Sequence, residues 1–173
     1  MKGPTLKQIE EYRQKGLKPG VVCFCVNGNK LLVLHKKEYG LWLIPQGGIL
    51  AGETPAGAME REIKEELGTK LFKNIEKPYV YLGDGEVMLN KKFYGEHELE
   101  TESGTKIPLD GKKYFFYAIA VKKPDLEIKD TEYDDGFWLD YEGCKYIFNR
   151  SYQVNKKELN LKMLDKLKEK GLL

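Results

Sequence analysis

The chain has 173 residues, of which 41% are hydrophobic and 32% charged, so it can bury a core and is not globally disordered. Its formal net charge is only +2, from 29 basic and 27 acidic residues, which argues against a protein that coats nucleic acid over its whole surface. We expect a single domain over residues 1–173, without internal repeats or an inter-domain linker.

Membrane-spanning and disulfide-rich classes of protein are also excluded. No apolar run approaches the roughly 20 residues that cross a bilayer, and residues 1–18 lack the apolar centre of a signal peptide. The cysteines, Cys23, Cys25 and Cys144, are too few and odd in number for a disulfide framework. We therefore expect no membrane partner and a cytoplasmic location, while the sequence predicts nothing about oligomeric state.

The first part of the chain predicts one helix followed by short strands. The unbroken apolar run at 21–26 is typical of a strand that is buried on both faces. Asn27-Gly28 is a strong hairpin-turn signal, so the next apolar run returns antiparallel to the first. The predicted elements are an N-terminal helix at 5–16 and strands at 21–26, 31–34 and 42–44.

The second part predicts helices at both ends of a strand-rich region. A helix at 55–67 carries apolar side chains at helical spacing, so one of its sides faces the core. The polar segment 84–112 predicts a long loop or an irregular hairpin, and long loops in compact domains are often functional. The remaining elements are strands at 79–82, 114–121 and 137–139 and an amphipathic C-terminal helix at 155–170.

Three carboxylates gather on one side of the helix at 55–67. The three positions are i, i+3 and i+4, occupied by Glu62, Glu65 and Glu66. Like charges at this spacing destabilise a helix by roughly a few tenths of a kcal/mol. Hard oxygen ligands held in this way suit Mg²⁺ or Mn²⁺, whose charge removes the repulsion. Taken alone, the same pattern is also compatible with an acidic face that is simply solvated.

The residues around these glutamates resemble the signature of the Nudix hydrolases, G-x5-E-x7-R-E-U-x-E-E-x-G-U, where U is a bulky aliphatic residue. The segment 47–69 departs from it only at Thr69, where the family has an aliphatic residue. Arg61, one of only three arginines in the chain, falls on the arginine of the signature. The matching residues are Gly47, Glu53, Arg61, Glu62, Ile63, Glu65, Glu66 and Gly68.

The resemblance implies a fold and a set of roles. The fold would be α/β, an α/β/α sandwich with a mixed sheet, covered by the glutamate helix on one side and the terminal helices on the other. Glu53 and Arg61 would brace the loop against the helix, and Glu62, Glu65 and Glu66 would hold Mg²⁺ or Mn²⁺. One of these glutamates, or another carboxylate nearby, would activate water.

Residues outside the signature resemble the RNA 5′-pyrophosphohydrolase branch and the related dinucleoside polyphosphate hydrolases. Matching segments include 42–49 and 138–141, and Glu132 falls where that branch has a further metal-binding or base glutamate. An ordinary surface acid is the alternative for Glu132. Lysines, among them Lys18, stand where the branch often has arginine. The expected substrate contacts are Lys36, Lys37, Gln46, Gly47 and Gly48.

The implied reaction is metal-dependent hydrolysis of a phosphoanhydride bond in a nucleoside diphosphate derivative. The expected substrate is the 5′-polyphosphate end of an RNA, in particular 5′-triphosphorylated RNA, or a dinucleoside polyphosphate. Two alternatives stay open. The substrate could instead be ADP-ribose or a nucleotide sugar, or the chain could be a non-catalytic binding module of the same fold.

Other side chains have simpler explanations. Cys23 and Cys25 share one face of an apolar strand, so they are expected in the core rather than in a metal site. His35 and His97 are too few for a histidine metal site. Four tyrosines could stack on a base, but most of them are expected in the core or on the sheet surface: Tyr79, Tyr81, Tyr114 and Tyr117. The lysine-rich helix at 155–170, with a net charge of +3, is expected to be a solvated face rather than an RNA contact.

Overall fold

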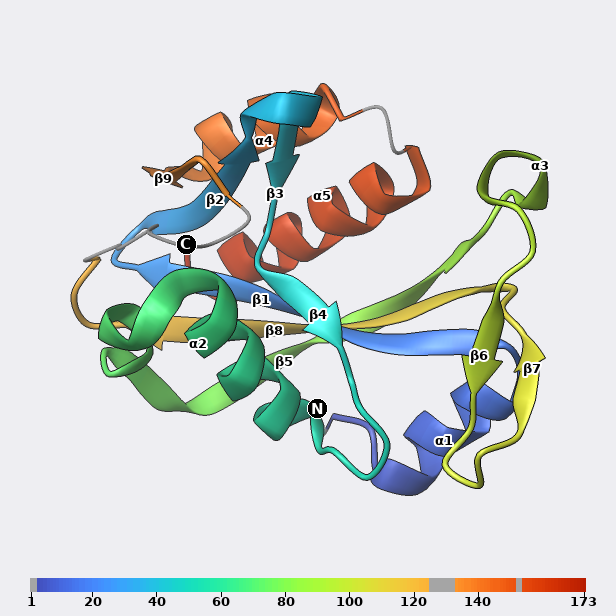
Figure 1. The fold of residues 1–173 in the computed structure, drawn as a ribbon. Coiled ribbons are helices and arrows are strands. Elements are labelled where there is room, and N and C mark those ends of the chain that lie inside the picture. The colour runs from blue at the N-terminus through green and yellow to red at the C-terminus, as the bar shows by residue number, and fades with distance from the viewer. Residues whose placement is uncertain (1–2, 125–132, 152–153) are drawn as a thin grey trace.

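The computed structural model describes residues 3–124, 133–151 and 154–173 (Figure 1). In these ranges the helices are α1 (Leu6–Gln14), α2 (Pro55–Phe72), α3 (Lys91–Tyr94), α4 (Tyr141–Asn149) and α5 (Val154–Glu169), with a 3₁₀ turn, η1, at Lys37–Tyr39. The strands are β1 (Leu17–Asn27), β2 (Lys30–Lys36), β3 (Leu41–Leu43), β4 (Gln46–Gly48), β5 (Ile75–Met88), β6 (Glu98–Glu100), β7 (Lys106–Pro108), β8 (Gly111–Val121) and β9 (Asp135–Leu139).

The main sheet is mixed, as expected. Its strands run in the order β3-β2-β1-β8-β5, while β4 pairs with β1 and β9 pairs with β2. The pair β1–β8 is parallel, and the other pairs of this sheet in the described part of the chain are antiparallel. β4 pairs with one short stretch of β1, from Gly20 to Val22, and no other described strand pairs with it. Side chains of α2 bond to its backbone instead, namely Glu66 to the Gln46 amide and Arg61 to the Gly48 carbonyl.

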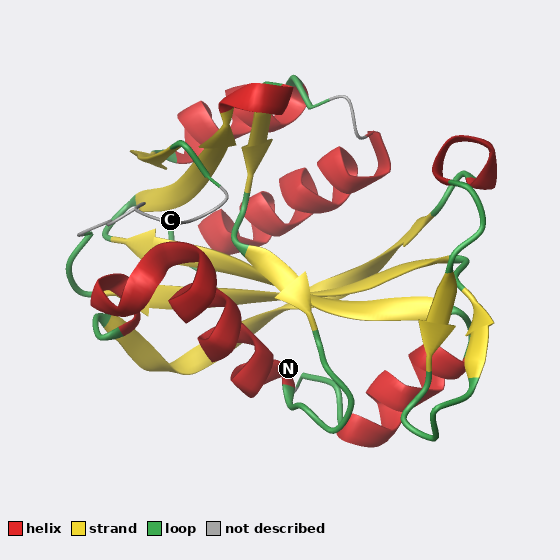
Figure 2. Cartoon of the chain, viewed as in Figure 1, coloured by secondary structure: helices red, strands yellow, loops and turns green. Residues whose placement is uncertain are grey.

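Helices cover both faces of this sheet (Figure 2). Alternate residues of β1 enter two separate clusters: Cys23 packs toward α2, and Phe24 packs toward α4 and α5. This explains the unbroken apolar run at 21–26, and it confirms that Cys23 and Cys25 are core residues. Burial raises the pKa of the Cys25 thiol to about 12, so it stays a protonated, apolar filler.

The α/β/α sandwich is confirmed, but the expected placement of both terminal helices on one side is wrong. Ile9 of α1 is fully buried in the same cluster as Met59 and Ile63 of α2, so α1 shares the face of the glutamate helix. α5 alone of the two terminal helices covers the opposite face, where it packs with α4 through Met163 and Leu167. The sequence predicted a helix at 5–16, but a helix this polar gives no signal for the face of the sheet that it covers.

The polar segment 84–112 is largely ordered, so the expectation of a long loop is wrong and that of a hairpin is correct. β5 extends to Met88, far beyond the predicted strand at 79–82, and α3 follows it. The β6–β7 hairpin then forms a separate two-stranded sheet. α4, which begins at the cap residue Asp140, was not predicted.

None of the helices within the described ranges combines the length and apolar character needed to cross a bilayer.

Candidate active site at the glutamate helix

The glutamates are positioned by a loop that runs from β4 into α2. The hydroxyl oxygen of Thr54 accepts a hydrogen bond from the Gly57 amide at 3.1 Å, and Pro55 occupies the first helical turn, so the start of α2 is fixed. The helix is interrupted at Gly68, whose φ of 81° is left-handed, and a last turn reaches Phe72. The sequence therefore predicted the end of the main helix correctly.

Arg61 is the hub of the site. Its guanidinium donates to both carboxylate oxygens of Glu53, at 3.0 and 2.9 Å, and to the carbonyl of Gly48 at 2.7 Å. It also pairs with Glu62 at 2.6 Å and with Glu65 at 3.3 Å. Only a planar fork of donors satisfies this many partners at once, which lysine could not do. The expected bracing of the loop by Glu53 and Arg61 matches this geometry.

Glu62 lies directly against Gly47 of β4. A Cβ atom built on Gly47 would lie 1.7 Å from the carboxyl carbon of Glu62, a distance that no real contact allows. Burial raises the pKa of Glu62, and repulsion from Glu65 and Glu53 adds to this, while Arg61 acts in the opposite direction. The absence of a side chain at Gly47 is therefore what lets this carboxylate reach the strand.

Glu66 is held by two donors: Gln46, which the sequence assigned to the site as a substrate contact, and Tyr133, which it did not assign. The backbone amide of Gln46 donates to one of its oxygens at 3.1 Å, and the hydroxyl of Tyr133 donates to the other at 2.8 Å. Tyr133 is buried next to α2 and precedes β9, so tertiary folding alone brings it here. Glu65, with 60% of its side chain exposed, is the most accessible of the three glutamates.

Glu62, Glu65 and Glu66 have the right chemistry to bind a divalent cation, because carboxylate oxygens are the ligands that Mg²⁺ and Mn²⁺ prefer. In the described part of the chain, no three acidic, histidine or cysteine side chains are already gathered as a ligand cage. Instead Arg61 neutralises Glu62 and Glu65 here. Glu132, the further candidate ligand, lies outside the described residues.

Two of the expected substrate contacts, Lys36 and Lys37, do not line the surface hollow that lies next to β4. Lys37 forms an ion pair with Asp135 of β9 at 2.9 Å, and the ammonium of Lys36 lies 5.5 Å from the centre of the Tyr39 ring. Gln46, Gly47 and Gly48 do line the hollow, while their contact with a substrate stays a prediction.

That hollow, which we call the lysine pocket, has a volume of about 210 Å³ and lies next to β4. The sequence pointed to Lys18 as a basic position and to Tyr114 as a residue that could stack on a base, but it missed Lys112. All three residues line the pocket. Lys156 of α5 reaches the same place, because its ammonium donates to the side-chain oxygen of Gln46. The expectation that the lysines of the C-terminal helix form a solvated face is thus wrong for Lys156, which is half-buried.

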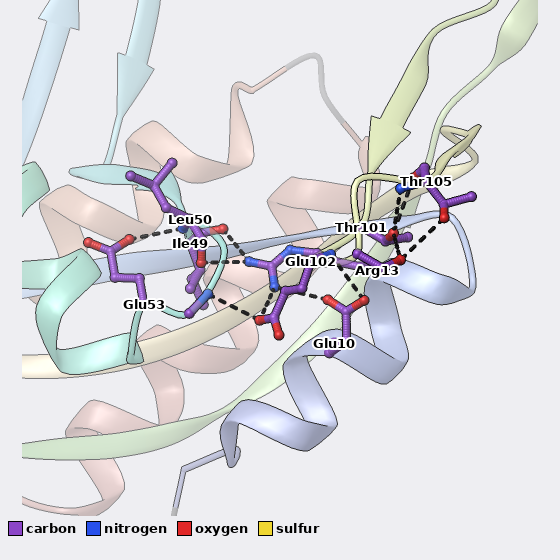
Figure 3. Close-up of polar contacts among 10 residues, drawn as sticks. Glu10, Arg13, Ile49, Leu50, Glu53, Thr101, Glu102 and Thr105 are labelled. Carbon is purple, nitrogen blue, oxygen red and sulfur yellow. Dashed lines mark hydrogen bonds and ion pairs between the residues drawn. The ribbon is translucent and has the colours of Figure 1, made fainter.

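Arg13 of α1 supports the same loop from its other end (Figure 3). This arginine is only 3% exposed, and it donates to the carbonyls of Ile49 and Leu50 at 2.6 and 2.8 Å. It also pairs with Glu10 and with Glu102 of the β6–β7 turn, at 3.3 and 3.2 Å. We call these contacts the Arg13 brace. Because the Leu50 amide in turn donates to Glu53 at 2.9 Å, the brace connects to Arg61.

The chain thus has a mixed sheet between helices and an arginine-braced loop that leads into a helix rich in glutamate. The chain belongs to the NUDIX family, because the model of the NUDIX domain matches residues 16–154. Enzymes of this family generally use divalent metal ions.

Curated relatives share the sequence at modest identity. The chain is 34% identical over 104 residues to an RNA pyrophosphohydrolase of a Nitratiruptor species, an alignment that covers 58% of this chain and 59% of that protein. It is 29% identical over 120 residues to an RNA pyrophosphohydrolase of Francisella tularensis subsp. tularensis, covering 65% of this chain and 70% of that one. The chain thus spans less than two thirds of the Nitratiruptor protein.

Solved structures share the fold. The E. coli dihydroneopterin triphosphate pyrophosphohydrolase aligns over 87% of this chain and 95% of its own, with a TM-score of 0.62 and 14% identity. A C. elegans Ap4A hydrolase aligns over 88% of this chain and 96% of its own, with a TM-score of 0.56 and 14% identity. At this identity, the likeness concerns the arrangement of helices and strands alone.

Proposed function

We propose that this Nudix hydrolase cleaves a phosphoanhydride bond in a nucleoside diphosphate derivative, with Mg²⁺ or Mn²⁺ as cofactor. The proposed substrate is 5′-triphosphorylated RNA or a dinucleoside polyphosphate. The observation that carries the proposal is the complete set of glutamates on α2, with Glu62 seated against Gly47 and Glu66 fixed by Gln46 and Tyr133. The names of the curated relatives support the choice of RNA as substrate.

Each residue of the site has a separate task in this proposal. Glu62, Glu65 and Glu66 would hold the cation, which supplies charge neutralisation on the phosphates and a lower pKa for the attacking water. Glu53 accepts two hydrogen bonds from Arg61, so it positions the loop and is poorly placed to take a proton. Gly47 and Gly48 let the substrate approach the backbone of β4 closely.

The test is a hydrolysis assay in the presence of Mg²⁺ over a panel of substrates: triphosphorylated RNA, diadenosine tetraphosphate, ADP-ribose and a nucleotide sugar. We expect turnover of one of the first two, and we expect Glu66→Gln to lower kcat by about 100-fold, because a neutral amide holds a divalent cation less well than a carboxylate does. Release of phosphate or nucleotide is the readout.

Glu60→Gln is a matched control on the same helix. Glu60 pairs with Lys77 at 2.7 Å and with Tyr79 at 2.8 Å, away from the other glutamates, so this variant should keep the activity of the wild type. If no substrate is hydrolysed, or if Glu66→Gln is as active as Glu60→Gln, the enzymatic proposal is wrong. Turnover restricted to ADP-ribose or the nucleotide sugar would refute the proposed substrate class.

A further inference from the structure

The lysine pocket gathers positive charge from three elements that are distant in sequence. Lys18 comes from β1, Lys112 from β8 and Lys156 from the first turn of α5. Lys18 and Lys112 are register partners in the parallel pair β1–β8, so their side chains leave the sheet next to each other. Like charges at such positions repel, which costs stability unless something neutralises them.

Among the described residues, no acid forms an ion pair with Lys18, Lys112 or Lys156. The neighbouring Lys113, on the other face of the sheet, shows the contrast, because two carboxylates bind it at 2.7 and 3.0 Å. Burial lowers the pKa of Lys112, and Lys18 lowers it further. Burial and then Lys112 lower the pKa of Lys156 to about 8, against a smaller opposing effect of Glu66.

The other walls of the pocket are suited to a phosphate chain. Gly47 and Gly48 present bare backbone, and Gln46 and Tyr114 add polar groups at the edge. The ammonium of Lys156 lies 5.0 Å from the centre of the Tyr114 ring, so it is held in place by a cation–π contact as well as by Gln46. An anion in the pocket would meet pre-positioned donors.

The lysine pocket is continuous with the glutamate site. Gln46 receives Lys156 on its side chain and directs its backbone amide to Glu66, while the carboxylate of Glu62 lies against Gly47. One strand, β4, therefore lies between the three lysines and the carboxylates of α2. Because the two groups lie on either side of the same strand, a chain of phosphates is better suited than a single phosphate to contact both.

We propose that the lysine pocket binds the phosphate groups of the substrate next to the glutamate site, so that the enzyme prefers chains of three or more phosphates to a two-phosphate linkage. This inference rests on the proposed function for the identity of the substrate. Lys18, Lys112 and Lys156 act as binding and specificity residues. The charge of the phosphate chain removes the repulsion among the three ammonium groups, which is the physical reason for the preference.

The first experiment measures binding without turnover. Inorganic tripolyphosphate is titrated calorimetrically into the full chain in EDTA, for wild type, Lys112→Met, Lys156→Met and the control Lys162→Met, an exposed lysine of the same helix. We expect each pocket variant to bind about tenfold more weakly, the loss that one charged hydrogen bond explains, and the control to bind as wild type does. Unchanged binding in both pocket variants would overturn the proposal, as would absent binding in the wild type.

The second experiment compares substrates with Mg²⁺. For diadenosine tetraphosphate, the pocket variants should raise KM about tenfold with little change in kcat, and for ADP-ribose they should leave KM unchanged. An equal effect on both substrates would refute the preference for long phosphate chains. If tripolyphosphate binds through Lys112 but no nucleotide is hydrolysed, the proposed function fails while the anion site stands. Because Lys112 and Lys156 lie on different elements, a folding defect in one variant leaves the other as a test.

Discussion

Adding a single carbon at Gly47 should lower the catalytic rate while the protein still folds. In Gly47→Ala the new methyl group would collide with the carboxylate of Glu62, which must then leave the strand. We expect kcat to fall by about 100-fold, the usual cost of a displacement of about 1 Å at a reacting group. The measurement is a hydrolysis assay on the preferred substrate, with circular dichroism to confirm that the variant is folded.

Gly48→Ala serves as the comparison, because a Cβ atom at Gly48 would meet only the side chain of Lys18, at an ordinary 3.5 Å. Its loss of kcat should be much smaller. Equal losses in the two variants would mean that β4 tolerates no side chain at all, and the specific role of the Gly47–Glu62 contact would be refuted.

Arg13 should matter for stability more than any other charged residue of α1, because it is the buried one. Arg13→Met removes a buried cation and leaves two carbonyls of the loop without donors, so we expect the free energy of unfolding to fall by about 2–4 kcal/mol. Arg13→Lys keeps the charge but cannot reach four partners, and it should recover only part of the loss. Urea denaturation measures both variants.

Arg150→Met is the matched control for Arg13, since Arg150 is exposed and lies over the Tyr146 ring. Its effect should stay within about 0.5 kcal/mol, as for most surface substitutions. A loss in Arg13→Met no larger than this would show that the Arg13 brace is not a stabilising feature.

The sequence predicted the part of the site that is local in the chain. Glu62, Glu65 and Glu66 lie within two turns of one helix, so their spacing alone predicted a shared side. Tyr133 and Lys112 could not be predicted, because they reach the site only through pairing of strands far apart in the sequence. The lysine pocket exists only in the folded molecule, and no local pattern predicts it.

Among the elements, β5 and β8 are joined by an ion pair between Asp84 and Lys113, which should make stability depend on pH. Burial by itself would raise the pKa of Asp84, but hydrogen bonds from Lys113 and Tyr81 bring it below its ordinary value of 3.8. A carboxylate with a lowered pKa stabilises the fold fully above its unfolded pKa, and this stabilisation is lost as the pH falls through the lower, folded value. The free energy of unfolding should therefore decrease below about pH 4.

In Lys113→Met this loss on acidification should be smaller than in the wild type, because the pKa of Asp84 then returns toward its ordinary value. Lys122→Met is the control: it removes an exposed lysine that pairs with Glu76 at 3.3 Å and lies beside the same two strands. Urea denaturation between about pH 2.5 and 6, a range that spans the titration of carboxylates, measures the slopes. Equal slopes in wild type and Lys113→Met would contradict the assignment to Asp84.

The elements that could not be predicted from the sequence are those without a regular pattern of apolar residues. β5 was predicted only at 79–82, because Pro78, Gly83 and Gly85 interrupt its apolar pattern, yet it continues from Ile75 to Met88 beside β8. α4 is short and rich in aromatic residues, which favour strands by propensity, and its start depends on the Asp140 cap, whose side chain accepts from Gly143 at 2.8 Å. Tertiary contacts decide such elements.

For the whole molecule, we expect the free energy of local unfolding to be highest in the two central strands, β1 and β8. Residues Val21 to Cys25 of β1 and Phe115 to Ile119 of β8 are buried between helices on both faces. The β6–β7 hairpin is a separate, mostly exposed sheet and should open at a much lower free energy. Hydrogen exchange read by mass spectrometry tests this order, and equal protection of the hairpin and β1 would contradict it.

The parallel pairing of β1 with β8 also has a consequence for how the protein is made. Leu17 cannot meet its partner Gly111 until most of the chain has left the ribosome, so β1, the glutamate helix and β5 are all synthesised before the strand that lies between β1 and β5. β8 must therefore insert between β1 and β5 after both have been made. Its pairing with β1 closes a long loop of chain, which slows folding. A nascent chain that ends before β8 would therefore expose its apolar strand edges, and we expect chaperones to bind such chains.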